Sequence, residues 1–253
     1  MGRVQQSRCQ GEGKGDLREK QGEKVIPICI STVHGKGLPV LLESIKQYAP
    51  EAFVYLRGTE RVVSGYKNAR LIFGETRNFG DDYNEVIDDA LKYAQACIVC
   101  NDDVVLTPTS YQRLLEDVQV IKELEPNVGW VGARSDCVRP SQNIRYNPDG
   151  DPLYMNRFKS EQFIRPTDNV SPIFAYISRD AWHHGRFGPL NWYSDDVSCA
   201  DLTTQGYRHF VSSAYVHHVG SQTIGENAQQ LVAEALPWIK ENRPQYVEHF
   251  FGT

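Results

Sequence analysis

The fold is decided by the stretch VIPICIST, residues Val25–Thr32, together with VHGKGLPVLLESI, residues 33–45, which follows it. The first stretch is an apolar run of strand length, and the second opens with a turn at residues 34–37. Pro39 stands in the first turn of a helical pattern, where proline is tolerated. The apolar stripe of that pattern consists of Leu38, Leu41, Leu42 and Ile45. We therefore expect a strand, a turn and a helix, the repeating unit of an α/β protein.

The same alternation continues along the chain. Further strands are expected at Ala52–Leu56, Ala69–Phe73, Cys97–Cys100, Val128–Ala133, Val170–Ser178 and His209–Val216. Further helices are expected from a cap at Asp81 or Asp82 to Ala94, and at Ser110–Leu124, Asp180–His184, Asp195–Gln205 and Glu226–Glu241. Strands that alternate with helices predict a mostly parallel sheet with helices on both faces. Ligands of such sheets bind at the carboxyl ends of the strands, so polar residues just after a strand are the candidates for chemistry.

Composition divides the chain into three predicted parts. Residues 1–24 are polar and charged and predict a flexible tail, residues 25–224 a single domain, and residues 225–253 a C-terminal helical appendage. Residues 134–169 interrupt the pattern with a long polar insert, which in a compact domain is usually functional or disordered. This insert could form a basic lid over a diphosphate, or it could be a solvated loop. Its basic residues are Arg134, Arg139, Arg145, Arg157, Lys159 and Arg165.

Charge and cysteine usage narrow the class of protein. The net charge of -5 argues against a protein that coats nucleic acid, because phosphate backbones attract basic surfaces. No apolar run reaches the ~18 residues of a membrane-spanning helix, and the first residues hold no apolar leader. Cys97 and Cys100 lie three apart in an expected strand, where their side chains point to opposite faces and do not readily share a metal. We expect reduced cysteines and a cytoplasmic protein.

Acidic and amide side chains follow the expected strand at Cys97–Cys100. Asn101, Asp102 and Asp103 offer hard oxygen ligands for Mn²⁺ or Mg²⁺, which could bridge the oxygens of a diphosphate. The alternative is an Asn-Asp turn that closes the strand.

Two later segments carry residues of the same kind. Asp195 and Asp196 stand near an expected helix N-terminus, which favours an ionised carboxylate, and the alternative is that Ser194 and Asp195 cap this helix. The run His217-His218-Val219-Gly220-Ser221 follows an expected strand and offers a histidine ligand, although a histidine there is as readily structural.

The run Asn101–Asp103, followed by an apolar pair and Pro108, resembles the variant Asp-x-Asp motif of GT-A glycosyltransferases, in particular inverting family 2 and its rhamnosyltransferase-like members. The resemblance extends in chain order to three further segments: residues 30–45, 78–90 and 191–223. It implies that Asp103 and His218 hold the metal, with His217 as the near alternative to His218. It implies a nucleotide site formed by Thr32, His34, Asn78, Gly80, Asn84, Asn101 and Asp102.

The same resemblance implies a catalytic and an acceptor side. Asp196 corresponds to the base, with Asp195 one register away, and Trp192 and Tyr193 correspond to aromatic residues around the acceptor. Two departures stand out. Leu56–Glu60 replaces a turn in which an acid usually contacts the nucleobase, and Leu202–Thr204 replaces a helix arginine of the family.

Together these patterns predict a metal-dependent, inverting glycosyltransferase of the hexosyltransferase type. It would move a sugar from a UDP-, GDP- or dTDP-linked donor to a hydroxyl of a saccharide or glycan acceptor. Two alternatives stay open. One is a sugar-phosphate nucleotidyltransferase, of whose glycine-rich loop Val33–Gly37 is a faint version, and the other is a catalytically silent module that binds sugar or nucleotide.

Overall fold

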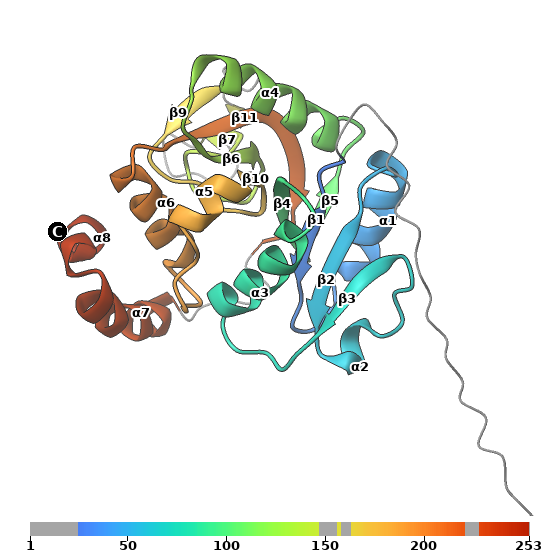
Figure 1. Ribbon diagram of the computed structural model, residues 1–253, viewed down its shortest axis with the longest axis horizontal. Coiled ribbons are helices and arrows are strands. Elements are labelled where there is room, and N and C mark those ends of the chain that lie inside the picture. The colour runs from blue at the N-terminus through green and yellow to red at the C-terminus, as the bar shows by residue number, and fades with distance from the viewer. Residues whose placement is uncertain (1–24, 147–155, 158–162, 221–227, 253) are drawn as a thin grey trace, which may run out of the picture.

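A nine-stranded sheet forms the centre of the molecule in the computed structural model, which describes residues 25–146, 156–157, 163–220 and 228–252 (Figure 1). The strand order is β3-β2-β1-β4-β10-β6-β11-β5, and β9 pairs with β11 beside this path. The strands are β1 (Ile28–Ser31), β2 (Val54–Gly58), β3 (Ala69–Phe73), β4 (Ala96–Asn101), β5 (Val104–Leu106), β6 (Val128–Arg134), β9 (Arg165–Thr167), β10 (Phe174–Ser178) and β11 (Arg208–His218).

Most of these strands run in one direction. The pairs β1–β2, β1–β4, β2–β3 and β6–β11 are parallel, whereas β10 lies antiparallel between β4 and β6. The short strands β5 and β9 are antiparallel to β11. The insert contributes a separate two-stranded ladder of β7 (Arg145–Tyr146) and β8 (Asn156–Arg157). The prediction of a mostly parallel α/β sheet is confirmed.

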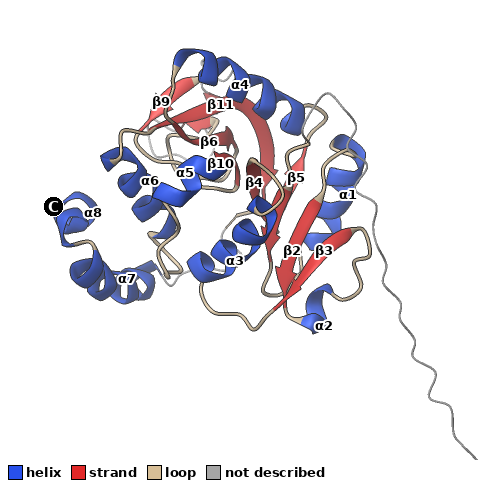
Figure 2. Ribbon diagram, viewed as in Figure 1, coloured by secondary structure: helices blue, strands red, loops and turns tan. Residues whose placement is uncertain are grey.

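Helices cover both faces of the sheet (Figure 2). One apolar cluster packs α1 (Leu38–Tyr48) and α4 (Ser110–Leu124) against the sheet. A second cluster on the opposite face packs α3 (Phe79–Leu91), α5 (Arg179–His184) and α6 (Ser194–Thr204), while α2 (Glu60–Val63) is a single turn after β2. Cys100 belongs to the first cluster and Cys97 to the second, so the prediction that they face opposite ways is confirmed.

The C-terminal segment packs on α6 through a third cluster. It consists of α7 (Ala228–Asn242), a 3₁₀ turn η1 (Pro244–Tyr246) and α8 (Val247–Phe251). Ile239 and Tyr246 are buried here against Leu190 and Val197. The predicted helix start at Glu226 lies outside the described residues. Within the described part of the chain, every helix is too short or too polar to cross a bilayer.

Several boundaries differ from the sequence-based expectation. The apolar run Val104–Leu106 after Asp103 does not extend β4. It forms the separate strand β5, which pairs with β11. The helix α3 begins at Phe79, and its cap is Asn78, whose side chain accepts a hydrogen bond from the Asp81 amide, rather than Asp81 or Asp82. The helix α6 is preceded by Tyr193 in a left-handed conformation (φ 65°), so neither Ser194 nor Asp195 caps it.

Candidate functional site

The carboxyl ends of β1 and β4 meet at one edge of the sheet, where Ser31 pairs with Asn101. Thr32 and Asp102 directly follow these strands, and the Thr32 hydroxyl donates a hydrogen bond to the Asp102 carboxylate. Burial raises the pKa of Asp102, and this hydrogen bond opposes the rise. His34 is exposed in the turn after β1 and interacts electrostatically with Asp102. Three residues predicted for the nucleotide site therefore lie together.

The turn after β1 also packs directly on the acidic segment. A Cβ at Gly37 would lie 2.4 Å from the Asp102 carbonyl oxygen and 2.9 Å from the Asp103 Cα. These contacts are too close for any side chain, so α1 reaches the Asp102–Asp103 backbone only because residue 37 is glycine.

Asp103 lies in the turn between β4 and β5, and His218 is the last residue of β11. Their side chains are in contact. The His218 Nε2 is 3.0 Å from the Asp103 Oδ1, and the His218 Nδ1 is 2.5 Å from the Cys137 carbonyl oxygen. Because a carbonyl only accepts, Nδ1 carries the proton and Nε2 faces the carboxylate. Burial lowers the pKa of His218, but the hydrogen bond and charge of Asp103 outweigh burial and raise it.

His217 lies on the other side of β11. Its Nδ1 is 2.8 Å from the Asp136 Oδ2, and its side chain is 49% exposed. The geometry therefore favours His218 over His217 as the partner of Asp103. Ser221, the last residue of the predicted motif, lies outside the described residues.

The Asp103–His218 pair fits a divalent cation in two respects. Its oxygen and nitrogen are 3.0 Å apart, about the spacing of adjacent ligands around an octahedral ion with bonds near 2.1 Å. The Cys137 carbonyl orients the histidine through its second nitrogen, as carbonyls do for metal-bound histidines. Among the described residues no cluster of three or more His, Cys, Asp or Glu side chains is arranged to hold a metal, so a bound ion would need further ligands from a substrate or water.

The acids Asp195 and Asp196 in the first turn of α6 are held by one arginine. The Arg139 Nη2 is 2.7 Å from the Asp195 Oδ2, the Nη1 is 2.9 Å from the Asp196 Oδ1, and the Nε donates to the Ser171 hydroxyl at 2.7 Å. Burial raises the pKa of Asp195 to about 6, the Asp196 charge adds to the rise, and Arg139 opposes it.

Arg139 comes from the insert, and its partners were not predicted from the sequence. The insert segment Asp136–Arg139 touches both acidic centres, because Cys137 accepts from His218 and Arg139 pairs with Asp195 and Asp196. One residue, Val138, lies between Cys137 and Arg139, so their Cα atoms are at most about 7 Å apart. The structure thus brings the Asp103–His218 pair and the Asp195–Asp196 pair to one region of the molecule.

Three other predicted nucleotide-site residues are engaged within the protein. The Asn78 side chain caps α3 and also donates to the Asp81 carboxylate at 2.8 Å. Both amide atoms of Asn84 bond the backbone of Phe187. A Cβ at Gly80 would lie 1.7 Å from the Gly188 carbonyl oxygen. These contacts give each residue a role in the fold, and contact with a nucleotide stays a prediction.

The two predicted acceptor aromatics lie just before α6. Trp192 and Tyr193 stack with ring centroids 6.2 Å apart, and Tyr193 packs on Phe250 and Phe251 of α8. Tyr193 therefore joins α6 to the C-terminal helices, and acceptor contact by either residue stays a prediction. Trp182 lies in the core, where its ring nitrogen donates to Asp88.

A pocket of about 680 Å³ lies along α6, with Asp196 in its lining. Asp195, Trp192 and Tyr193 are not part of this lining. Asn169 also lines this pocket, and its side chain donates a hydrogen bond to the Asp196 Oδ1 over 3.3 Å. Of the two candidate bases, Asp196 is therefore the one that a molecule in this pocket would meet.

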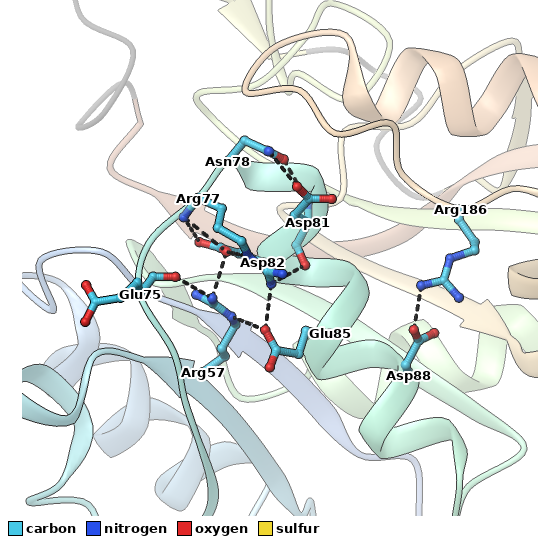
Figure 3. A network of polar contacts seen from close by, with 9 residues as sticks. All are labelled: Arg57, Glu75, Arg77, Asn78, Asp81, Asp82, Glu85, Asp88 and Arg186. Atoms are coloured by element: carbon cyan, nitrogen blue, oxygen red, sulfur yellow. Dashed lines mark hydrogen bonds and ion pairs between the residues drawn. The ribbon is translucent and has the colours of Figure 1, made fainter. Parts of the chain in front are cut away.

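Arg57 occupies the end of β2, where the resemblance led us to expect an acid. Its side chain is 1% exposed, and Figure 3 shows it between α3 and the loop after β3. Its Nη2 lies 2.9 Å from the Asp82 Oδ1 and donates to the Glu75 carbonyl, and its Nε donates to Glu85 at 3.0 Å. Arg77 binds the same two acids, which makes a closed network that ties β2 to α3.

Comparison with known proteins shows the fold. No family model and no curated protein sequence matches the chain. The structure is similar to S. aureus TarS residues 1–349 in complex with UDP-GlcNAc, with a TM-score of 0.53 at 12% identity over 80% of this chain and 61% of that chain. For TarS 1–349 alone the TM-score is 0.53 at 13% identity, covering 91% of this chain and 76% of that chain. For a further structure of TarS the TM-score is 0.52 at 15% identity, covering 84% of this chain and 40% of that chain. TarS is a GT-A-type glycosyltransferase, so the chain has a GT-A-like fold.

Proposed function

We propose that the protein is a metal-dependent, inverting glycosyltransferase that uses a nucleotide-diphosphate sugar. The observation that carries the proposal is that one short segment, Asp136–Arg139, contacts both the Asp103–His218 pair and the Asp195–Asp196 pair. The fold likeness to TarS, which is described in complex with UDP-GlcNAc, supports a nucleotide-sugar donor.

The donor half lies at the carboxyl ends of β1 and β4. Asp103 and His218 would hold Mn²⁺ or Mg²⁺, and the bound ion would stabilise the diphosphate as a leaving group. Thr32, Asp102 and Asn101 border the nucleotide side. Asp102 is already fixed by Thr32, so this part of the site is arranged before the donor binds.

The acceptor half is centred on Asp196. Its carboxylate accepts the proton of the acceptor hydroxyl while the oxygen attacks the anomeric carbon and the bond to the diphosphate breaks. Arg139 fixes the orientation of this carboxylate through the hydrogen bond at 2.9 Å, and its single positive charge offsets part of the charge of the two adjacent acids. A single displacement of this kind inverts the anomeric centre.

The test compares two adjacent histidines. We expect the wild-type chain to release nucleoside diphosphate from at least one sugar donor among UDP-, GDP- and dTDP-sugars with Mn²⁺, and EDTA to suppress this release. His218→Ala and Asp103→Asn should each lower the rate by about 100-fold or more, the scale of a lost metal ligand or of its support. His217→Ala is the matched control and should stay within about threefold of wild type, since it removes only the contact of a half-exposed ring with Asp136 and leaves Asp103 and His218 in place. Full metal-stimulated activity in His218→Ala and Asp103→Asn would refute the proposal.

A further inference from the structure

The pocket beside Asp196 is built by three separate parts of the chain. One face of α6 forms its floor, with Asp196, Ala200, Thr203 and Thr204 at helical spacing. The stretch Pro166–Asn169 forms one wall, and η1 and α8 form the other. Figure 1 shows α8 beside α6, and the third apolar cluster holds the C-terminal segment there.

The groups in the lining determine which ligands suit the pocket. Thr167, Asn169, Thr203 and Thr204 contribute hydroxyl and amide groups, and Asp168 and Asp196 add two carboxylates. The Thr167 and Thr204 hydroxyls donate to backbone carbonyls, so they offer a ligand their oxygens as acceptors. The lining contains one arginine, Arg208, whose Nη1 is 2.9 Å from the Glu125 carboxylate. The two carboxylates repel phosphate and carboxylate ligands, because like charges at close range are unfavourable. Arg208 is already paired with Glu125, so it attracts such anions less than an unpaired arginine would.

Aromatic rings complete the walls. Tyr207, Tyr246 and Phe250 line the pocket, and the Tyr207 and Tyr246 hydroxyls are bonded to Asp180 and Asp201. Because these hydroxyls already have partners, the rings contribute mainly apolar surface to the lining. A sugar ring has this same division, because its C–H face is apolar and its rim carries hydroxyls. The volume of about 680 Å³ lies within the range of small-ligand pockets, about 300–1,000 Å³.

We propose that this pocket between α6 and α8 is the acceptor site and that it takes a short neutral saccharide. Asp196 belongs to its lining, so a saccharide hydroxyl placed beside it meets the carboxylate that Arg139 holds from outside the lining. The C-terminal helices are then part of the active site. The role of this pocket as the acceptor site rests on the proposed function, whereas the class of ligand, a neutral saccharide, rests on the lining residues alone.

The experiment measures saccharide binding without donor or metal. Saturation-transfer difference NMR on the full chain is recorded with cellobiose, lactose and N,N′-diacetylchitobiose, and with the anions digalacturonate and glycerol 3-phosphate. Two variants fill the pocket, Thr203→Trp and Thr204→Trp, at exposed positions of α6 that line it. Gln205→Trp is the matched control, since Gln205 is exposed at the end of the same helix and outside the lining.

We expect at least one neutral disaccharide to bind wild type and Gln205→Trp in the millimolar range, and the filling variants to weaken binding about tenfold or more. Folding of each variant is checked by its thermal melt. The proposal is overturned if no neutral disaccharide binds at up to about 20 mM, far above the millimolar affinity expected. It is also overturned if the anions bind better, or if both folded filling variants bind like Gln205→Trp. Loss of the donor chemistry at Asp103 and His218 would leave this measurement unchanged, so the two failures are distinguishable.

Discussion

Asp195 makes the stability of the protein depend on pH in a direction that can be calculated. Its pKa is about 6 in the folded protein against an ordinary value of 3.8. A difference of about 2 units corresponds to about 3 kcal/mol, by which the ionised group destabilises the fold. The folded state holds the proton more tightly, so this penalty is absent below pH 3.8, grows as pH rises, and is complete above pH 6. Asp195→Asn removes the ionisation and therefore removes this penalty.

The assay is urea unfolding of wild type and Asp195→Asn, followed by tryptophan fluorescence at pH 4.5 and 7.5. About 2 of the 3 kcal/mol fall between these pH values, because part of the loss has already occurred at pH 4.5. The stability difference between the variant and wild type should therefore grow by about 2 kcal/mol from pH 4.5 to pH 7.5, or by about 0.7 M in urea midpoint for a slope near 3 kcal/mol per molar. Asp168→Asn, at an exposed position nearby, is the control and should show less than half of this change. An Asp195→Asn curve parallel to wild type across this range would refute the reasoning.

Three further predictions concern packing and thiol exposure. Arg57→Met removes one of the two arginines that pair with the buried Asp82 and leaves Arg77, so it should cost about 2–3 kcal/mol in urea unfolding, less than the roughly 3–5 kcal/mol of a buried acid with no partner. Arg70→Met breaks an exposed pair and should cost at most about 1 kcal/mol; equal losses would contradict this. Gly80→Ala forces the Gly188 backbone to move and should cost about 1–3 kcal/mol, while Gly65→Ala, with open space around it, serves as the control in the same thermal melt. In a Cys9→Ser background, Ellman's reagent should label Cys137 rapidly and the buried Cys29, Cys97, Cys100 and Cys199 only on unfolding; fast reaction of several thiols would show that the core is open.

Elements with strong local periodicity were predictable from the sequence. The helix α4 was expected at Ser110–Leu124 and β3 at Ala69–Phe73, and both have these bounds. Their apolar spacing fixes the buried face, whatever the rest of the chain does. Local pattern also placed Cys97 and Cys100 on opposite faces of β4.

Features that depend on distant partners were not predictable. The apolar run Val104–Leu106 continues the pattern of β4, yet it pairs with the end of β11, more than 100 residues later in the chain. Arg139 lies in a polar insert that resembles a solvated loop, and only the tertiary structure places it on Asp195 and Asp196. The left-handed Tyr193 before α6 has no sequence signal, because glycine or asparagine is usual in that conformation.

For candidate site residues, the sequence supplied the list and the structure supplied the grouping. Polar residues after strands share one sheet edge by topology, which explains why Thr32 meets Asp102. Choosing between His217 and His218 required the actual path of β11, since adjacent strand residues face opposite sides.

The position of β10 in the sheet has a consequence for how the chain folds. This strand fills the gap between β4 and β6 and runs antiparallel to both, yet it begins at Phe174, long after β4 ends at Asn101. During synthesis the apolar edge of β4 has no partner until the ribosome has released residues beyond 178. An exposed strand edge invites pairing with other chains, and such distant pairing is slow. We therefore expect nascent chains that stop between β6 and β10 to be the aggregation-prone ones, and the full sheet to close late and all at once.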